Sequence, residues 1–408
     1  MARSEDRVVK ALCDMLKVKA VGPENGGAGE GERGEFLLDL AKGMGFDSVE
    51  LYESGDPRVP SGRRPNIVVR VRGTSDRNVW VVTHMDIVPE GDLDAWNSPP
   101  YEPRVENGRV YARGAEDNGQ DLIASLFGLE ALVRAGVRPE ANVGLAFVSD
   151  EEYGNTHGID VLINKGIFRE GDLIVVPDHG YPDGSKIAVV EKSVAWVRVV
   201  VIGKQTHAST PDNGVNAFET AARYLAACMD RLREKFSASD DLFDPPGSTF
   251  VPSRCEANGK NINTVPGRQE FACDFRVLPE YPLDDVLAEM RKIATKVEEA
   301  SGAKIEVSFI DRAPSAGRTS PDSEVVRRLS KAISEVGGFT PDAIGIGGAT
   351  CASPFRRIGL DAAAWSMIPG TGHDANEYIE ISGLMFDAKV YAVLFAGDNV
   401  SRPQPATP

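Results

Sequence analysis

Apolar positions along the chain follow two spacings. Nearly continuous apolar runs predict buried strands at residues 66–72, 78–82, 142–148 and 172–176, and apolar residues three or four apart predict helices at 8–16, 35–44 and 121–135. Asn107-Gly108 predicts a hairpin turn between strands at 101–105 and 109–112. Because strands and helices alternate, we predict an α/β fold with a mostly parallel central sheet flanked by helices.

The pattern changes after residue 192. Residues 193–312 predict a strand, a helix, two strands, a helix and a strand, at 194–202, 216–236, 250–257, 269–277, 282–300 and 304–310. This order is typical of a ferredoxin-like α+β domain. The α/β pattern then returns, with helices at 323–336 and 382–395 and strands at 343–346 and 362–367. We therefore predict a discontinuous α/β domain (1–192 and 313–408) that carries an inserted domain (193–312).

The composition and charge of the chain argue against nucleic-acid and membrane partners. The 408 residues carry a net charge of −16, which repels nucleic-acid phosphates and argues against a nucleic-acid partner. The five cysteines are scattered and form no CxxC pair, which is typical of reduced thiols in a cytoplasmic protein. The N-terminal segment lacks the apolar core of a signal peptide, and no apolar run approaches the length of a bilayer-spanning helix. We therefore expect a cytoplasmic protein with no membrane partner.

Acidic and imidazole side chains follow several of the predicted strands. Functional groups in open α/β sheets gather beyond the carboxyl ends of the strands. The candidates in or after these strand ends and Gly-rich turns are His84, Asp86, Asp117, Glu151, Glu152, Asp178 and His373. Imidazole nitrogens and carboxylate oxygens are ligands that zinc prefers. The set predicts a pair of Zn²⁺ ions that activate a water to split an amide.

Two short motifs indicate how the work is divided. His84 and Asp86 form an H-x-D pair, in which the carboxylate orients a metal-binding imidazole. Asp150-Glu151-Glu152 places three acids in a row, and such acids repel one another unless cations hold them. We expect one of the two glutamates to bind metal and its neighbour to take the proton of the attacking water.

Single motifs also fit plainer roles. Asp117 could cap the helix that follows it, and the acidic triplet could be a solvated loop. The convergence of several sites at one sheet edge favours a metal-bridging role for Asp117. His157 and His179 lie near candidate ligands in sequence, but we assign both to loops outside the site.

The segments from His84 to Trp96 and from Gly108 to Asp117, with the inserted domain, are similar to those of the M20 family of metallopeptidases and amidohydrolases, which includes succinyl-diaminopimelate desuccinylase and acetylornithine deacetylase. The resemblance covers nearly the whole chain. It implies a zinc-peptidase-like catalytic domain, an inserted lid, and two divalent metal ions, zinc with Co²⁺ or Mn²⁺ as alternatives.

The resemblance also implies a role for each candidate. His84 and Asp178 would bind one ion, and Glu152 and His373 would bind the other. Asp117 would bridge the two ions, with a cis peptide to Asn118. Glu151 would be the general base and then the acid that protonates the leaving amine.

In the inserted domain, the resemblance implies that His207 steadies the oxyanion and that Asn263 and Arg276 hold substrate. The segment Gly347-Gly348-Ala349-Thr350 would grip a carboxylate, with Gly348 and Thr350 as binding residues. It further implies a homodimer formed through this lid domain. We therefore expect a small-molecule or dipeptide substrate with a free carboxylate, cleaved as by an N-acyl amino acid deacylase or desuccinylase.

Three alternatives remain. One alternative is a dipeptidase or carboxypeptidase of the same family, because the sequence distinguishes these activities poorly from that of a deacylase. A dinuclear aminopeptidase without a lid has the same ligand types, but the inserted domain argues against it. A non-catalytic binding protein is disfavoured because all the ligand positions and Glu151 are present. Departures from the family pattern at Asn118-Gly119-Gln120 and Cys351-Ala352 bear on substrate, not on metal.

Overall fold

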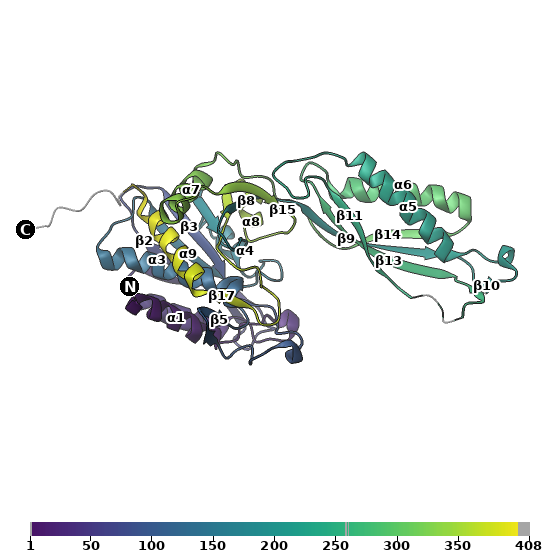
Figure 1. Ribbon diagram of the computed structural model, residues 1–408. Coiled ribbons are helices and arrows are strands. Elements are labelled where there is room, and N and C mark those ends of the chain that lie inside the picture. Colours follow the sequence, from purple (N-terminus) through teal and green to yellow (C-terminus); the bar gives the residue numbers. More distant parts are fainter. Residues whose placement is uncertain (1, 258, 260, 399–408) are drawn as a thin grey trace, which may run out of the picture. The chain divides into compact units, whose positions relative to one another are not determined.

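The computed structural model describes residues 2–257, 259 and 261–398, and these divide into two compact units (Figure 1). The first unit comprises the chain up to Val189, Arg318–Ala343, and the chain from Thr350 on. The second unit comprises Val190–Gly317 and Ile344–Ala349. In the part of the chain that the structure describes, no helix combines the length and apolarity needed to cross a membrane.

An eight-stranded sheet forms the centre of the first unit. Its strands in spatial order are β1 (Ser48–Gly55), β2 (Arg63–Val71), β6 (Asn142–Val148), β3 (Asn78–His84), β7 (Leu173–Val176), β16 (Ala362–Ala364), β8 (Lys186–Glu191) and β15 (Asp342–Ile346). The four strands β6, β3, β7 and β16 run parallel, whereas β1, β2 and β8 pair in antiparallel fashion. The predicted mostly parallel sheet is therefore parallel at its centre and mixed as a whole.

Helices cover this sheet. They are α1 (Ala2–Leu16), α2 (Gly31–Lys42), α3 (Gln120–Ala135), α4 (Ile159–Asn164), α7 (Glu324–Gly337), α8 (Ser353–Arg357) and α9 (Ile381–Ala396). Helices α3 and α9 lie side by side (Figure 1), and both are buried along most of their length. Gly128 allows this approach, because a Cβ there would lie 2.7 Å from the Ala388 carbonyl oxygen.

Short elements complete the first unit. A three-stranded sheet has the order β17 (Tyr378–Glu380), β5 (Arg109–Tyr111) and β4 (Arg104–Glu106), and single turns are η1 (Pro23–Asn25), η2 (Leu93–Ala95) and the π-turn η3 (Ala115–Gly119). The predicted hairpin at Asn107-Gly108 is confirmed. Both residues have positive φ, 52° and 76°, as a two-residue turn of this kind requires.

The second unit is a four-stranded antiparallel sheet covered by two helices. The strand order is β11 (Thr249–Cys255), β13 (Arg268–Val277), β9 (Ser193–Ile202) and β14 (Lys304–Ala313), and the helices are α5 (Ala217–Lys235) and α6 (Leu283–Ser301). Minor elements are β10 (Thr206–His207), η4 (Pro211–Asn213) and β12 (Thr264–Val265). The chain order β-α-β-β-α-β and the alternating buried positions of β9 give the predicted ferredoxin-like arrangement.

The fold-class prediction is confirmed. The elements missed by sequence include the edge strand β1, the internal strand β8, and the short elements α4 and β17. The predicted domain boundaries at 192/193 and 312/313 stay predictions.

A buried ion-pair cluster fixes the end of β6, where the acidic triplet begins. Arg64 on β2 is fully buried and donates to both Glu30 and Asp150, with Nε to Glu30 Oε2 at 2.9 Å and Nη1 to Asp150 Oδ1 at 2.9 Å. Asp150 has φ 65°, so its backbone needs this support. The cluster therefore sets the course of the backbone leading into Glu151.

We predict that Arg64→Leu lowers the free energy of unfolding by about 3–5 kcal/mol, because it leaves the buried carboxylates of Glu30 and Asp150 without their cation. Urea unfolding followed by tryptophan fluorescence measures this. The matched control is Arg63→Leu on the same strand. Arg63 is exposed and forms an ion pair with exposed Glu53, so its loss should cost about 1 kcal/mol or less. Equal effects for the two variants would contradict the prediction.

Candidate metal centre

Three neighbouring parallel strands bring the predicted ligands to one edge of the sheet. Strand β3 pairs with β6 on one side and with β7 on the other. His84 ends β3, Glu151 and Glu152 follow β6, and Asp178 follows β7 by two residues. Because the three strands run parallel, their carboxyl ends meet at the same edge.

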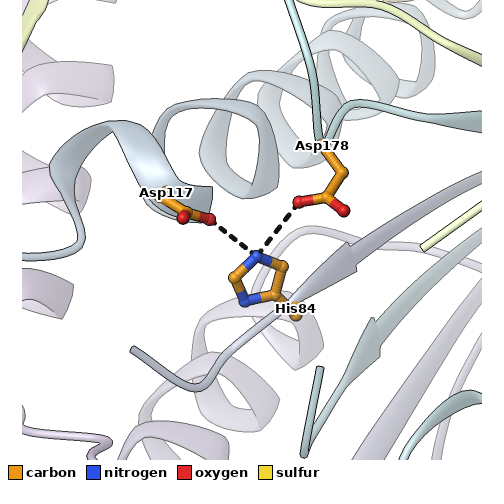
Figure 2. A group of neighbouring side chains, drawn as sticks. All are labelled: His84, Asp117 and Asp178. Carbon is orange, nitrogen blue, oxygen red and sulfur yellow. Dashed lines mark ion pairs between the residues drawn. The ribbon is translucent and has the colours of Figure 1, made fainter. Parts of the chain in front are cut away.

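One group contains His84, Asp117 and Asp178 (Figure 2). The imidazole Nε2 of His84 lies 2.8 Å from Asp117 Oδ1 and 3.4 Å from Asp178 Oδ1. Both carboxylates point toward the same ring nitrogen, and one donor atom from each of the three residues lies within 4.8 Å of the others. These distances leave a common point that a cation could share.

A second group contains Asp117, Glu152 and His373. His373 Nε2 lies 3.0 Å from Asp117 Oδ2 and 3.2 Å from Glu152 Oε2. Asp117 therefore belongs to both groups and presents one carboxylate oxygen to each. The peptide between Asp117 and Asn118 is cis, as the resemblance implied.

Asp86 supports both sides of this edge. The Nδ1 of His84 lies 3.0 Å from the backbone oxygen of Asp86 and 3.6 Å from its carboxylate, so the backbone oxygen is the nearer partner. The carboxylate instead accepts hydrogen bonds from the backbone N–H groups of Glu151 and Glu152, at 3.1 and 3.0 Å. Asp86 thus orients His84 through its main chain and holds the glutamate turn through its side chain.

The donor set fits divalent metal ions. Glu152 Oε1 is buried without a hydrogen-bond partner among the described residues, and such an atom is costly unless a ligand satisfies it. His84 Nε2 is buried and faces the carboxylates of Asp117 and Asp178. Burial is the largest influence and lowers the pKa of the His84 imidazole, but the hydrogen bonds and charge of Asp117, Asp178 and Asp86 together raise this pKa well above its usual value. Asp117 and then Glu152 raise the pKa of His373 to about 10. The carboxylates therefore stabilise positive charge next to them. When no metal cation is bound, protonation of the two imidazoles provides that charge.

Glu151 lies beside the two groups without belonging to either. It is half-buried, and donor atoms of Glu151, Asp178 and Cys351 lie within 4.8 Å of one another. Burial, followed by the charge of Asp178, raises the pKa of Glu151 well above its usual value. The carboxyl group is therefore disposed to hold a proton next to the metal ligands.

A cavity of about 340 Å³ opens beside Asp117, Asp178 and His373. Its lining also includes His179, which we expected outside the site. His157 does lie in a loop away from these groups. Its Nδ1 is 2.9 Å from Ser54 Oγ, and its Nε2 is 3.5 Å from Asp56.

Sequence reasoning gave no role to four residues that hold the site. Cys351 donates its backbone N–H to Asp178 Oδ2 at 2.8 Å, and buried Glu116, Arg113 and Glu377 fix the segments around Asp117 and His373. No local pattern marks these residues, because their partners are distant in sequence. The sequence offered one hint of these roles, which is that acidic residues stand at 116, beside Asp117, and at 377, four residues after His373.

Most of the predicted substrate residues lie in the second unit. His207 is exposed on β10, which pairs with β12, and Asn263 directly precedes β12. Arg276 on β13 donates Nε and Nη2 to Asp274, at 2.8 and 3.0 Å, and Nη1 to the Gly347 oxygen at 2.7 Å. The structure thus brings Arg276 next to the Gly-rich segment that contains Gly348.

Thr350, at the other end of that segment, belongs to the first unit and is buried. Its Oγ1 accepts from the backbone N–H of Ala352 at 3.1 Å. The hydroxyl therefore takes part in the turn that leads into α8.

Comparisons with known proteins agree with this geometry. The model of the peptidase family M20/M25/M40 matches residues 80–396. An uncharacterised metallohydrolase of Methanocaldococcus jannaschii is 33% identical over 401 residues, covering 95% of this chain and 98% of that relative. A succinyl-diaminopimelate desuccinylase of Gluconacetobacter diazotrophicus is 26% identical over 384 residues, covering 93% and 94%.

The fold is also known from solved structures. An M20 family metallo-carboxypeptidase from Sulfolobus solfataricus superposes with a TM-score of 0.71 at 20% identity, covering 95% of this chain and 98% of that one. The family model spans most of the chain, and the relative from M. jannaschii spans nearly all of it. The chain is therefore a metal-dependent hydrolase of C–N amide bonds that belongs to the M20/M25/M40 peptidase family.

Proposed function

We propose that this protein is a dinuclear metal hydrolase that removes an acyl group from a small, carboxylate-bearing N-acyl amino acid. The observation that carries the proposal is the sharing of Asp117 between two groups of ligands, with Glu151 beside them. Such an arrangement could place one cation on each side of the Asp117 carboxylate. Glu151 would then be a proton acceptor close to both cations.

In this proposal His84 and Asp178 would hold one ion, Glu152 and His373 would hold the other, and Asp117 would serve both. When bound, the two divalent ions, zinc with cobalt or manganese as alternatives, polarise the amide carbonyl and lower the pKa of water. The nitrogen and oxygen donors suit all three metals.

Glu151 is proposed to move the proton. It takes a proton from the attacking water and later delivers it to the leaving amine, as a general base and then a general acid. Asp86 supports this work because its carboxylate fixes the backbone of Glu151 at 3.1 Å.

Recognition of the substrate is assigned to the second unit and the Gly-rich segment. Arg276 has five N–H donors and uses three of them on Asp274 and Gly347, which leaves two for a substrate carboxylate. Gly348 and Thr350 would add contacts to the same carboxylate. His207 would donate to the oxyanion, and Asn263 would hold the acyl portion.

We also propose a homodimer that forms through the second unit. Strand β11 lies at the edge of its sheet, and Val251 on this strand is half exposed. An edge strand offers unpaired backbone groups to a second copy of the chain.

The main alternative is a dipeptidase or carboxypeptidase with the same metal centre. The relative from G. diazotrophicus is a succinyl-diaminopimelate desuccinylase, whereas the S. solfataricus structure is that of a metallo-carboxypeptidase. We therefore expect a panel assay with zinc and with cobalt to give higher kcat/KM for N-succinyl or N-acetyl amino acids than for dipeptides. Carboxamide counterparts of the best substrate are the control and should react poorly. Faster hydrolysis of dipeptides would favour the alternative, and no turnover of any substrate would favour a binding protein.

The proton-transfer role predicts that Glu151→Gln retains both metal ions but lowers kcat by about 10²–10⁴-fold, because the amide cannot accept a proton. Metal analysis and steady-state kinetics measure the two effects separately. The adjacent change Glu152→Gln is the contrast, since it should lose metal as well as activity. Normal turnover by Glu151→Gln would show that another group is the base.

Metal binding should be stronger at higher pH. In the cation-free protein His373, with a pKa of about 10, and His84, with its raised pKa, are protonated at neutral pH. Each must lose its proton to bind a cation, so apparent affinity should rise about tenfold per pH unit for each proton released. The rise should continue until the pH passes the pKa values of the cation-free imidazoles.

Calorimetry in buffers of different ionisation enthalpy counts the protons released. His373→Ala is the control, because it should release one proton fewer and bind one ion fewer. An affinity that stays constant between about pH 7 and 9 would contradict the assignment of these imidazoles as ligands.

A further inference from the structure

The segments that carry Asp117 and His373 hold each other through two crossed carboxylates. Glu116, next to Asp117, accepts hydrogen bonds from Gly370 N at 3.1 Å and from Thr371 N and Oγ1, both at 2.7 Å. Glu377, four residues after His373, accepts from the backbone N–H groups of Gly114, Glu116 and Asp117. Each segment therefore anchors the other with a buried side chain, 4% exposed for Glu116 and 0% for Glu377.

The two crossed contacts act on different parts of the centre. Glu377 holds the backbone of Asp117, which belongs to both groups of ligands. Glu116 holds residues 370 and 371, which lead only into His373. A change at Glu116 should therefore affect one group and spare the other.

His373 depends on such support more than His84 does. The side chain of His373 is 54% exposed, whereas that of His84 is 1% exposed and locked in the core. His373 also has φ 67°, a backbone conformation that costs energy for a residue with a Cβ. Because the imidazole is half exposed, packing alone does not fix it. Its position therefore depends on the backbone conformation of the residues on either side of His373.

We propose that Glu116 is a positioning residue that fixes the His373 side of the metal centre. The proposal rests on the proposed function, because it assumes a cation held by Glu152 and His373. Glu116 touches neither metal nor substrate in this scheme. It acts by setting the course of residues 370 and 371, and so the place from which His373 Nε2 meets Asp117 and Glu152.

A carboxylate is required because one end of the side chain meets three donors. Both oxygens of Glu116 accept, one from Gly370 and the other from Thr371. A glutamine would keep one acceptor and turn an NH₂ group toward the remaining N–H donors, which leaves buried donors unpaired. The loop must then move away from residue 116 and take His373 with it.

The test is a Co²⁺ titration of the full-length metal-free protein, with visible absorption and equilibrium dialysis as readouts. Wild type should bind two ions. Glu116→Gln should bind one ion with wild-type affinity and the second about 10–100-fold more weakly. The spectrum of its tight ion should match that of His373→Ala, in which the same group of ligands is broken. Glu102→Gln, which changes an exposed glutamate, is the matched control and should behave as wild type.

A milder variant guards against misfolding. Thr371→Val removes the hydroxyl that donates to Glu116, together with its hydrogen bonds to the backbone of Tyr378, but preserves the shape of the side chain. It should weaken the same ion by a smaller factor, and the double variant should be less than additive, since both changes break one contact. Thermal unfolding of each variant shows whether it folds. If Glu116→Gln does not fold, the metal titration of Thr371→Val is the test of the proposal.

The outcomes separate this inference from the proposed function. If wild type binds two ions and both positioning variants bind both with unchanged affinity, the inference is wrong while the proposed function stands. Equal weakening of the two ions would also overturn it, because Glu116 would then support the whole site. If wild type itself binds fewer than two ions, the dinuclear function fails first.

Discussion

The two oxygens of Asp117 face two different imidazoles, and the rest of the site is arranged around this shared carboxylate. One oxygen lies 2.8 Å from His84 and the other 3.0 Å from His373. Further carboxylates from Asp178, Glu151 and Glu152 converge on the same region. Acids at such spacing repel one another unless positive charge lies between them, so this geometry is stable only with protons or cations in place. The repulsion among these acids is therefore relieved either by protons or by metal ions.

Three of the segments that bear candidate ligands are held at their backbones by buried carboxylates. Asp86 accepts from the N–H groups of 151 and 152, Glu377 from those of 114, 116 and 117, and Glu116 from those of 370 and 371. These segments leave regular secondary structure, so their N–H groups have no strand or helix partner and need another acceptor. The same chemistry that satisfies the turns also fixes the ligands before any ion binds. Arg113 pairs with Glu377, and Arg64 pairs with both Glu30 and Asp150, so each of these buried acids has a cationic partner.

The sequence predicts the sheet edge well because the signals there are local. Apolar runs that end in His84, Asp178 or the acidic triplet reveal strands and their carboxyl ends within a few residues. Strand β1 was missed because polar residues interrupt its apolar ones, and β8 because its apolar run is only four residues long, Ile187–Val190. The roles of Glu116 and Glu377 were out of reach for a different reason. Glu116 meets Gly370 across 254 positions, and no periodicity links the two.

Most of the residues proposed to recognise substrate lie in a different unit from those proposed to hold metal and move the proton. The candidate ligands, Glu151 and Asp86 all belong to the first unit, whereas His207, Asn263, Arg276 and Gly348 belong to the second. A metal centre held by backbone contacts within one unit can stay constant while residues on the other unit change. Desuccinylases and carboxypeptidases among the similar proteins are consistent with such a division, because function resides in sites carried by a fold and not in the fold itself. Arg276 illustrates the point. Asp274 and Gly347, both in the second unit, orient its guanidinium without help from the metal ligands, so the direction of its free N–H donors can evolve independently of the catalytic charges.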